Sequence, residues 1–120
     1  MNRFSSILLA ATLAVAVCTP ALADLCPPVP YGPNDTCSCD VRNYGTKPDT
    51  DVTITLFDDS GAKTCPSVTV LPGGIASCSN QPPFFGYCGC TVAGESSKTR
   101  ASLSAIPFGE AAARVTVSCN

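Results

Sequence analysis

Cysteine is the residue that most constrains what this chain can fold into. The sequence has 120 residues and nine cysteines, a density that in a small exported domain indicates a disulfide framework. Eight of the nine follow residue 23, and an even number allows complete pairing. We therefore treat these eight as disulfide candidates: Cys26, Cys37, Cys39, Cys65, Cys78, Cys88, Cys90 and Cys119.

Residues 1–23 have the pattern of a secretory signal peptide. Arg3 supplies a positive charge, residues 7–17 are an apolar run, and Ala21-Leu22-Ala23 has the small residues that precede a cleavage site. That run is shorter than the about 20 residues of a transmembrane helix. A lipoprotein modified at Cys18 is the alternative, although Val17 is larger than the residue such sites prefer. Cleavage predicts a secreted or periplasmic chain of 120 − 23 = 97 residues without a transmembrane segment.

Two C-x-C pairs, Cys37-Ser38-Cys39 and Cys88-Gly89-Cys90, each place two sulfurs on one face of a strand. Val41 and Val92 continue these faces, so both pairs should point into a core where they could bridge each other. A zinc or iron–sulfur site is the alternative. Neither pair has the usual C-x2-4-C spacing, and an oxidising compartment favours disulfides. We therefore expect no metal and no cofactor.

Disulfide connectivity is not fixed by the sequence alone, because eight cysteines can pair in many ways. Cys65 and Cys78 flank residues 68–77, which predict a hairpin with its turn at Pro72-Gly73-Gly74. We expect a Cys65–Cys78 bridge across the ends of this hairpin. We also expect the two C-x-C pairs to bridge each other and Cys26–Cys119 to join the termini.

Short alternating segments separated by turn residues predict an all-β fold. In residues 51–58, Val52, Ile54 and Leu56 share one face, while Phe57 lies on the other with two threonines. Residues 24–36 contain four prolines and predict an extended N-terminal arm outside a β-sandwich domain at 37–120. The chain should form a small antiparallel β-sandwich of about seven strands, namely 37–44, 51–58, 68–71, 75–79, 87–93, 100–106 and 114–119.

An ordered series of turn and strand residues carries a family resemblance. Val41-Arg42-Asn43-Tyr44-Gly45 is followed by the strand 51–58 and by Val70-Leu71-Pro72-Gly73-Gly74. Over about residues 39–79, this series resembles bacterial immunoglobulin-like and fibronectin-type-III-like sandwich modules, including adhesion-related ones. Such modules usually have few cysteines, which this chain does not share. The resemblance implies a sandwich and an exported location, and it carries over no active residue.

The composition argues against several classes of function. The chain has no histidine, so neither a Ser-His-Asp triad nor a Cys-His pair can form, and paired cysteines leave no thiol nucleophile. The nine acidic residues lie mostly in turns, where aspartate favours local hydrogen bonds over calcium binding. A net charge of −2 offers no basic surface for nucleic acid. We expect a protein that is not an enzyme and, without repeats or coiled-coil patterns, a monomer.

The segment Pro82-Pro83-Phe84-Phe85-Gly86-Tyr87 is the candidate contact loop. Two adjacent phenylalanines cannot both face the core of a regular strand. Phe84, Phe85 and Tyr87 therefore either contact a protein, a glycan or a membrane surface, or plug the end of the sandwich beneath the arm and its Tyr31. The sequence predicts an exported, disulfide-stabilised binding or structural module. The alternative is a secreted inhibitor or small toxin that acts through the loop at 79–87.

Overall fold

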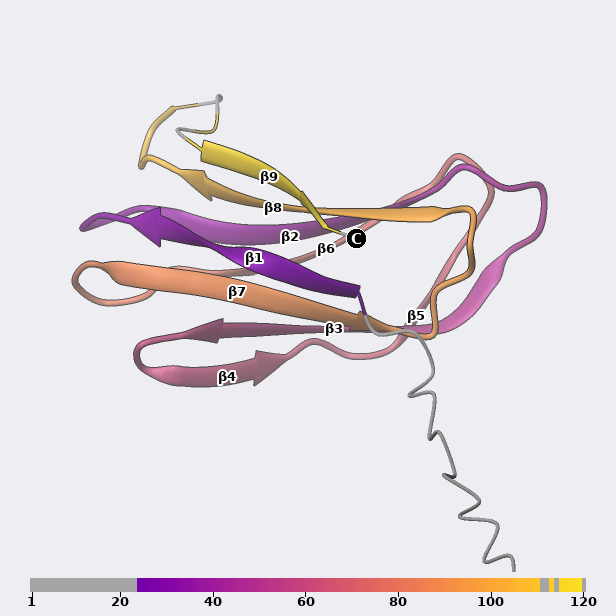
Figure 1. Cartoon of the computed structure of the whole chain (residues 1–120), viewed down its shortest axis with the longest axis horizontal. Coiled ribbons are helices and arrows are strands. Elements are labelled where there is room, and N and C mark those ends of the chain that lie inside the picture. The colour runs from indigo at the N-terminus through magenta and orange to yellow at the C-terminus, as the bar shows by residue number, and fades with distance from the viewer. Residues whose placement is uncertain (1–23, 111–112, 114, 120) are drawn as a thin grey trace, which may run out of the picture.

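The computed structural model describes residues 24–110, 113 and 115–119. The predicted signal peptide at 1–23, including Cys18, lies outside this range. Two antiparallel β-sheets pack face to face (Figure 1), which confirms the predicted all-β sandwich. The described residues form nine strands: β1 (Asp24–Tyr31), β2 (Thr36–Asn43), β3 (Asp49–Asp58), β4 (Gly61–Thr64), β5 (Val68–Val70), β6 (Ile75–Asn80), β7 (Gly86–Ala93), β8 (Thr99–Ile106) and β9 (Val115–Cys119).

We call the two layers sheet 1 and sheet 2. Sheet 1 has the order β1-β7-β3-β4, with the short β5 also paired to β3, and sheet 2 has the order β6-β2-β8-β9. In sheet 1, β7 lies between β1 and β3, and in sheet 2, β2 lies between β6 and β8.

The core lies between the sheets and is made by alternate residues of each strand. Val52, Ile54 and Leu56 of β3 are at most 3% exposed, as predicted for that face. The two C-x-C pairs are equally buried, which confirms that both point inward. The core side chains are small, and the largest that are fully buried are Leu56 and Leu103.

Two strands did not follow from the sequence. The segment expected as an arm outside the domain forms β1, an edge strand whose register shifts between Cys26 and Val29. Prolines 27 and 28 lie at this bulge, where a strand tolerates residues without an N–H donor. Strand β4 has four exposed residues and no alternating pattern, so nothing in its sequence marks it. It forms because the turn after Asp58 returns the chain along β3.

The predicted hairpin at 68–77 is wrong. β5 pairs with β3 in sheet 1, whereas β6 pairs with β2 in sheet 2. The turn between them therefore carries the chain from one sheet to the other. Gly73 adopts a φ of 75° there and donates its N–H to the Asn43 carbonyl, a backbone conformation that glycine adopts at little cost. The pattern of two short apolar segments around a glycine turn fits a crossover as well as a hairpin.

Three of the four disulfides join a strand of one sheet to a strand of the other, and the fourth joins Cys65, in the β4–β5 connection, to β6 of sheet 2. The pairs are Cys26–Cys119, Cys37–Cys88, Cys39–Cys90 and Cys65–Cys78, which agrees with the expected connectivity. The two C-x-C bridges run side by side between β2 and β7, with Cα–Cα distances of 6.6 and 6.4 Å. These separations are ordinary for disulfides, and the two bridges place four sulfurs in the space between the sheets.

Asn43, from the segment Val41-Arg42-Asn43-Tyr44-Gly45, has a structural role that its hydrogen bonds explain. Its side chain is fully buried, and its Nδ2 donates to the carbonyls of Val70 and Lys47 at 3.0 and 2.7 Å. Its Oδ1 accepts from the Gly45 N–H at 2.8 Å. One amide therefore satisfies backbone groups of two separate loops at the same end of the sandwich.

The two C-x-C bridges should be strongly coupled in stability. With Cys37–Cys88 intact, Cys39–Cys90 closes only a very small additional ring, so C39A/C90A should cost about 2 kcal/mol in loop entropy. The reciprocal C37A/C88A variant should cost about the same. Removing both bridges also opens the 51-residue separation, so the quadruple variant should lose about 6 kcal/mol. Urea unfolding measures all three, and additive losses would contradict the coupling.

Asn43→Ala should lower the free energy of unfolding by about 2–4 kcal/mol, because it leaves buried backbone groups without partners. The matched control is Asn80→Ala. Asn80 is only partly buried and donates one hydrogen bond, to Asp58, so its loss should be about 1 kcal/mol. Thermal and urea unfolding check the ranking. Equal losses of unfolding free energy in the two variants would contradict the larger contribution of the buried Asn43 amide.

Candidate functional site

The predicted contact loop is exposed. Phe84 and Phe85 lie in the β6–β7 connection with 80% and 76% of their surface accessible, and Tyr87 at the start of β7 is 63% exposed. The alternative in which these rings plug the sandwich is therefore wrong. Tyr31 of β1 fills that end instead, since it is only 6% exposed and its hydroxyl lies 2.9 Å from where a Cβ on Gly86 would be.

Phe84 has an unusual backbone conformation. Its φ is 70°, in the left-handed region that bulky side chains rarely adopt. No burial of the ring compensates for this cost, because the side chain points into solvent. Strained residues of this kind concentrate at binding sites and other functional positions. The conformation therefore favours the contact interpretation of the loop.

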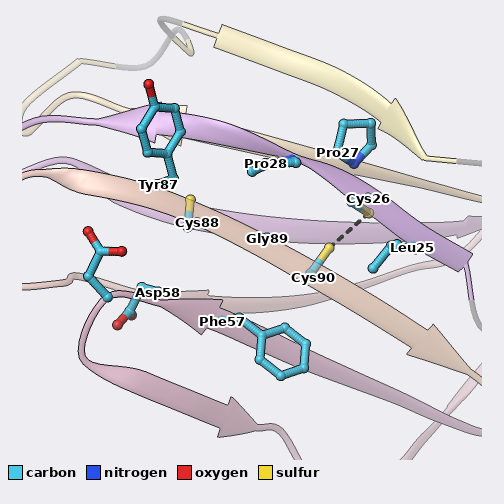
Figure 2. A pocket seen from close by; sticks show the side chains of 11 residues that line it. Leu25, Cys26, Pro27, Pro28, Phe57, Asp58, Tyr87, Cys88, Gly89 and Cys90 are labelled. Carbon is cyan, nitrogen blue, oxygen red and sulfur yellow. Dashed lines mark hydrogen bonds between the residues drawn. The ribbon is translucent and has the colours of Figure 1, made fainter.

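A groove on the outer face of sheet 1 adjoins this loop through Tyr87 (Figure 2). Its volume is about 450 Å³, and it runs across β1, β7 and the end of β3. Exposed apolar groups form its sides, while the two neighbouring acids lie at its end. The lining consists of the buried Cys26, Cys88 and Cys90, of Gly89, and of Leu25, Pro27, Pro28, Phe57, Asp58, Asp59 and Tyr87.

Gly89 makes the hollow. It pairs with Phe57 in the register of β7 and β3, at a position where any larger residue would fill the groove. The fold does not require glycine there, because its φ is not in the left-handed region and an added Cβ would meet only the Cys26 carbonyl, at 3.9 Å. The missing side chain therefore shapes the outer surface and leaves the packing of the core unaffected.

The sequence pointed to Tyr87 in this region and missed Leu25, Phe57 and Gly89 as neighbours. The available signal was the position of Phe57 on the outward face of its strand, where an aromatic ring among threonines is unusual. Placing it beside Tyr87 requires β3 to pair with β7. Placing Leu25 there requires β1 to pair with β7 as well.

Asp58 at the groove end is held in place by four hydrogen bonds. Its Oδ1 accepts from the Ser60 hydroxyl and the Ser60 N–H, its Oδ2 accepts from the Asn80 amide at 2.8 Å, and the Gly61 N–H contributes a further bond. Burial by itself would raise the pKa of Asp58, but these bonds outweigh it, so the pKa lies below its ordinary value. The carboxylate therefore acts as a turn and cross-sheet acceptor.

The side chain of Tyr31 lies against the same acids from inside. Burial is the main reason that its pKa is raised, and the charges of Asp59 and Asp58 raise it further, although a backbone hydrogen bond from Asp59 acts in the opposite direction. The phenol is therefore neutral at physiological pH.

Three cysteine sulfurs lie beneath the groove. Those of Cys26, Cys39 and Cys90 lie within 4.8 Å of one another, and the Cys26 and Cys90 sulfurs are 3.0 Å apart (Figure 2). Each belongs to a disulfide and carries no proton, so the short approach is a sulfur–sulfur contact. The sulfurs of both C-x-C pairs are likewise consumed in bridges, whereas metal binding requires thiolates.

Asp58→Asn should flatten the acid dependence of stability. The folded pKa of Asp58 lies below the unfolded value of about 4, so the carboxylate stabilises the fold above that pH. This contribution is lost as the pH falls through the folded pKa. Urea unfolding between about pH 7 and pH 2 should show a lower plateau and a smaller acid loss for the variant. An identical acid loss in wild type and variant would contradict the assignment.

The comparisons with known proteins concern the fold. In the described residues, no helix has the length and apolarity needed to cross a membrane. No protein-family model and no curated protein matches the chain. Among solved structures, the chain is similar to the crystal structure of Thermotoga maritima 1070, with a TM-score of 0.54 and 18% identity. The match covers 83% of this chain and 93% of that one, so the sandwich has a counterpart over nearly its whole described length.

Proposed function

We propose that this chain is an exported, disulfide-stabilised, non-enzymatic binding module that works as a monomer in a secreted or periplasmic location. It holds its partner on a surface made by the groove and the contact loop. We call this the aromatic surface and define it by Leu25, Phe57, Phe84, Phe85 and Tyr87. The observation that carries the proposal is that Leu25, Phe57 and Tyr87 are exposed around a groove that Gly89 keeps open, while the exposed Phe84 and Phe85 lie in the connection that leads to Tyr87.

The location and the absence of catalysis rest on supporting observations. Four disulfides are stable in an oxidising compartment, which fits the signal-peptide pattern. The groove holds neither histidine nor a free thiol. Of its two acids, Asp58 is engaged in hydrogen bonds to its own turn and to Asn80. The residues around the groove are therefore equipped for contact rather than for proton transfer.

A protein partner fits the aromatic surface better than a glycan. The groove sides are leucine, proline, phenylalanine and tyrosine, with few groups that could hydrogen bond to sugar hydroxyls. Exposed aromatic rings around a desolvated pocket are typical of binding hot spots between proteins. The resemblance to adhesion-related modules agrees with this choice. An apolar side chain of the partner would occupy the groove, while Phe84 and Phe85 contact the surface beside it.

A secreted inhibitor or small toxin is the second candidate. The contact loop lies between Cys78 and Cys88, and both of these are bridged to other parts of the fold. A short exposed loop fixed at both ends by disulfides is the arrangement an inhibitor requires. Inhibition of secreted proteases by the wild type, with loss in a Phe85→Ser variant, would favour this candidate over a general contact module.

Two substitutions should abolish binding without harming the fold. Gly89→Val fills the groove at a position with room for a side chain, and valine suits a strand. Phe84→Gly removes a ring where glycine fits the left-handed backbone, so stability should change by less than about 1 kcal/mol. The control is Leu71→Ser, which removes an exposed apolar side chain at the opposite end of the sandwich.

The measurement is retention of proteins from the exported fraction on the immobilised module. One protein should be retained by the wild type and by Leu71→Ser, and lost with both Gly89→Val and Phe84→Gly. Equal retention by all variants, or binding to a panel of neutral polysaccharides with the same variant pattern, would overturn the protein-partner proposal. Unfolding curves recorded for each variant establish that lost binding is not lost structure.

A further inference from the structure

The outer face of sheet 2 carries a pair of arginines that the aromatic surface does not involve. Residues of β2 alternate, so that Cys37, Cys39 and Val41 face the core while Asp40 and Arg42 face outward. Arg42 lies directly opposite Arg100 in the register of β2 and β8. Two like charges at directly opposed positions destabilise a sheet. The two arginines of the described residues therefore stand in an arrangement that the fold alone does not favour.

Neutral groups hold the two guanidinium groups in the described part of the chain. Within the described part of the chain, the recorded partners of the two guanidinium groups are backbone carbonyls and one aromatic ring. Arg100 donates from one terminal nitrogen to the carbonyls of Ser97 and Thr99, both at 3.0 Å. Arg42 lies 5.9 Å from the centre of the Tyr44 ring. Both cations are thus positioned by neutral groups and keep donors for another acceptor.

Asp40, the acid on the same outward face of β2, is already engaged. Asp40 lies one alternate position before Arg42, and its Oδ1 accepts from the hydroxyls of Ser38 and Ser77 at 3.1 and 2.5 Å. It pairs with Ser102 across the strands, not with either arginine. Its charge still adds to the local field, so a ligand carrying many negative charges would be repelled at this edge of the site.

These groups share one hollow. A depression of about 470 Å³ lies on this face, and its lining combines two cations, an exposed ring and several hydroxyl or carboxylate oxygens. The members that matter here are Asp40, Arg42, Tyr44, Arg100, Ser102 and Ser118. Tyr44 is 64% exposed, so its ring is available to a ligand as well as to Arg42.

We propose that this depression binds an acidic sugar, a pyranose ring that carries a single carboxylate. The two guanidinium groups supply the donors that match a carboxylate. The apolar face of the sugar ring packs on Tyr44, and its hydroxyls bond to Asp40 and the serines. The single carboxylate of such a sugar binds the two arginines. Its uncharged hydroxyls lie near Asp40, so no second negative charge is placed beside that carboxylate. The site lies on the opposite sheet from the aromatic surface and does not depend on that surface having a partner.

The test is an NMR titration of the whole folded chain with sodium glucuronate. Amide shifts should concentrate on β2 and β8 around Arg42 and Arg100, with saturation in the millimolar range. Glucose should bind at least tenfold more weakly because it lacks the charge. Acetate and inorganic sulfate should each bind at least fivefold more weakly because they lack the sugar ring. If sulfate bound as tightly as glucuronate, the acidic-sugar proposal would be wrong and the depression would be a general anion site.

Variants give an independent check. Arg42→Gln or Arg100→Gln should each weaken glucuronate binding at least tenfold, and Tyr44→Leu at least threefold. The control Lys47→Gln removes an exposed cation outside the depression and should change affinity less than twofold. Because the like-charge pair is relieved, neither arginine variant should unfold at lower urea than the wild type. Equal weakening by all four variants, or no shifts on β2 and β8, would overturn the site.

Discussion

The paired C-x-C bridges between β2 and β7 are the constraint on which the rest of this structure depends. They hold two central strands of opposite sheets with Cα atoms 6.6 and 6.4 Å apart. The buried apolar residues around them are mostly cysteine and valine, with few larger side chains. A small domain with such a core gains limited hydrophobic free energy from folding. The four disulfides add to this by restricting the unfolded chain.

A sandwich held in this way can bear unfavourable features on its surface. Phe84 keeps a left-handed backbone with its ring in solvent, and Arg42 lies directly opposite Arg100. Features of this kind persist where the surrounding structure is strong enough to fix them. The groove beside the Phe84 loop lies on sheet 1 and the arginine pair on sheet 2, so the two outer faces are chemically distinct. One is apolar and aromatic, and the other is polar with a local positive charge.

Much of the fold could be predicted from the sequence because its signals are local. Alternation placed Val52, Ile54 and Leu56 inward, and the two C-x-C spacings placed four sulfurs on facing strands. The prediction failed where the local pattern was silent or ambiguous. The prolines of β1 hid an edge strand, β4 has no apolar residue that its partner must cover, and the glycine turn at 72–74 joins two sheets rather than two paired strands.

The sequence by itself determined the class of fold and the disulfide-rich character, because both depend on residue types and on spacing along the chain. Only the tertiary structure decided that the two phenylalanines are exposed and which strands are neighbours. The groove exists because β1, β7 and β3 lie side by side with Gly89 between Leu25 and Phe57. The arginine pair exists because β8 joins β2. Strand pairing is a contact between distant segments, and its choice rests on the packing of the whole chain.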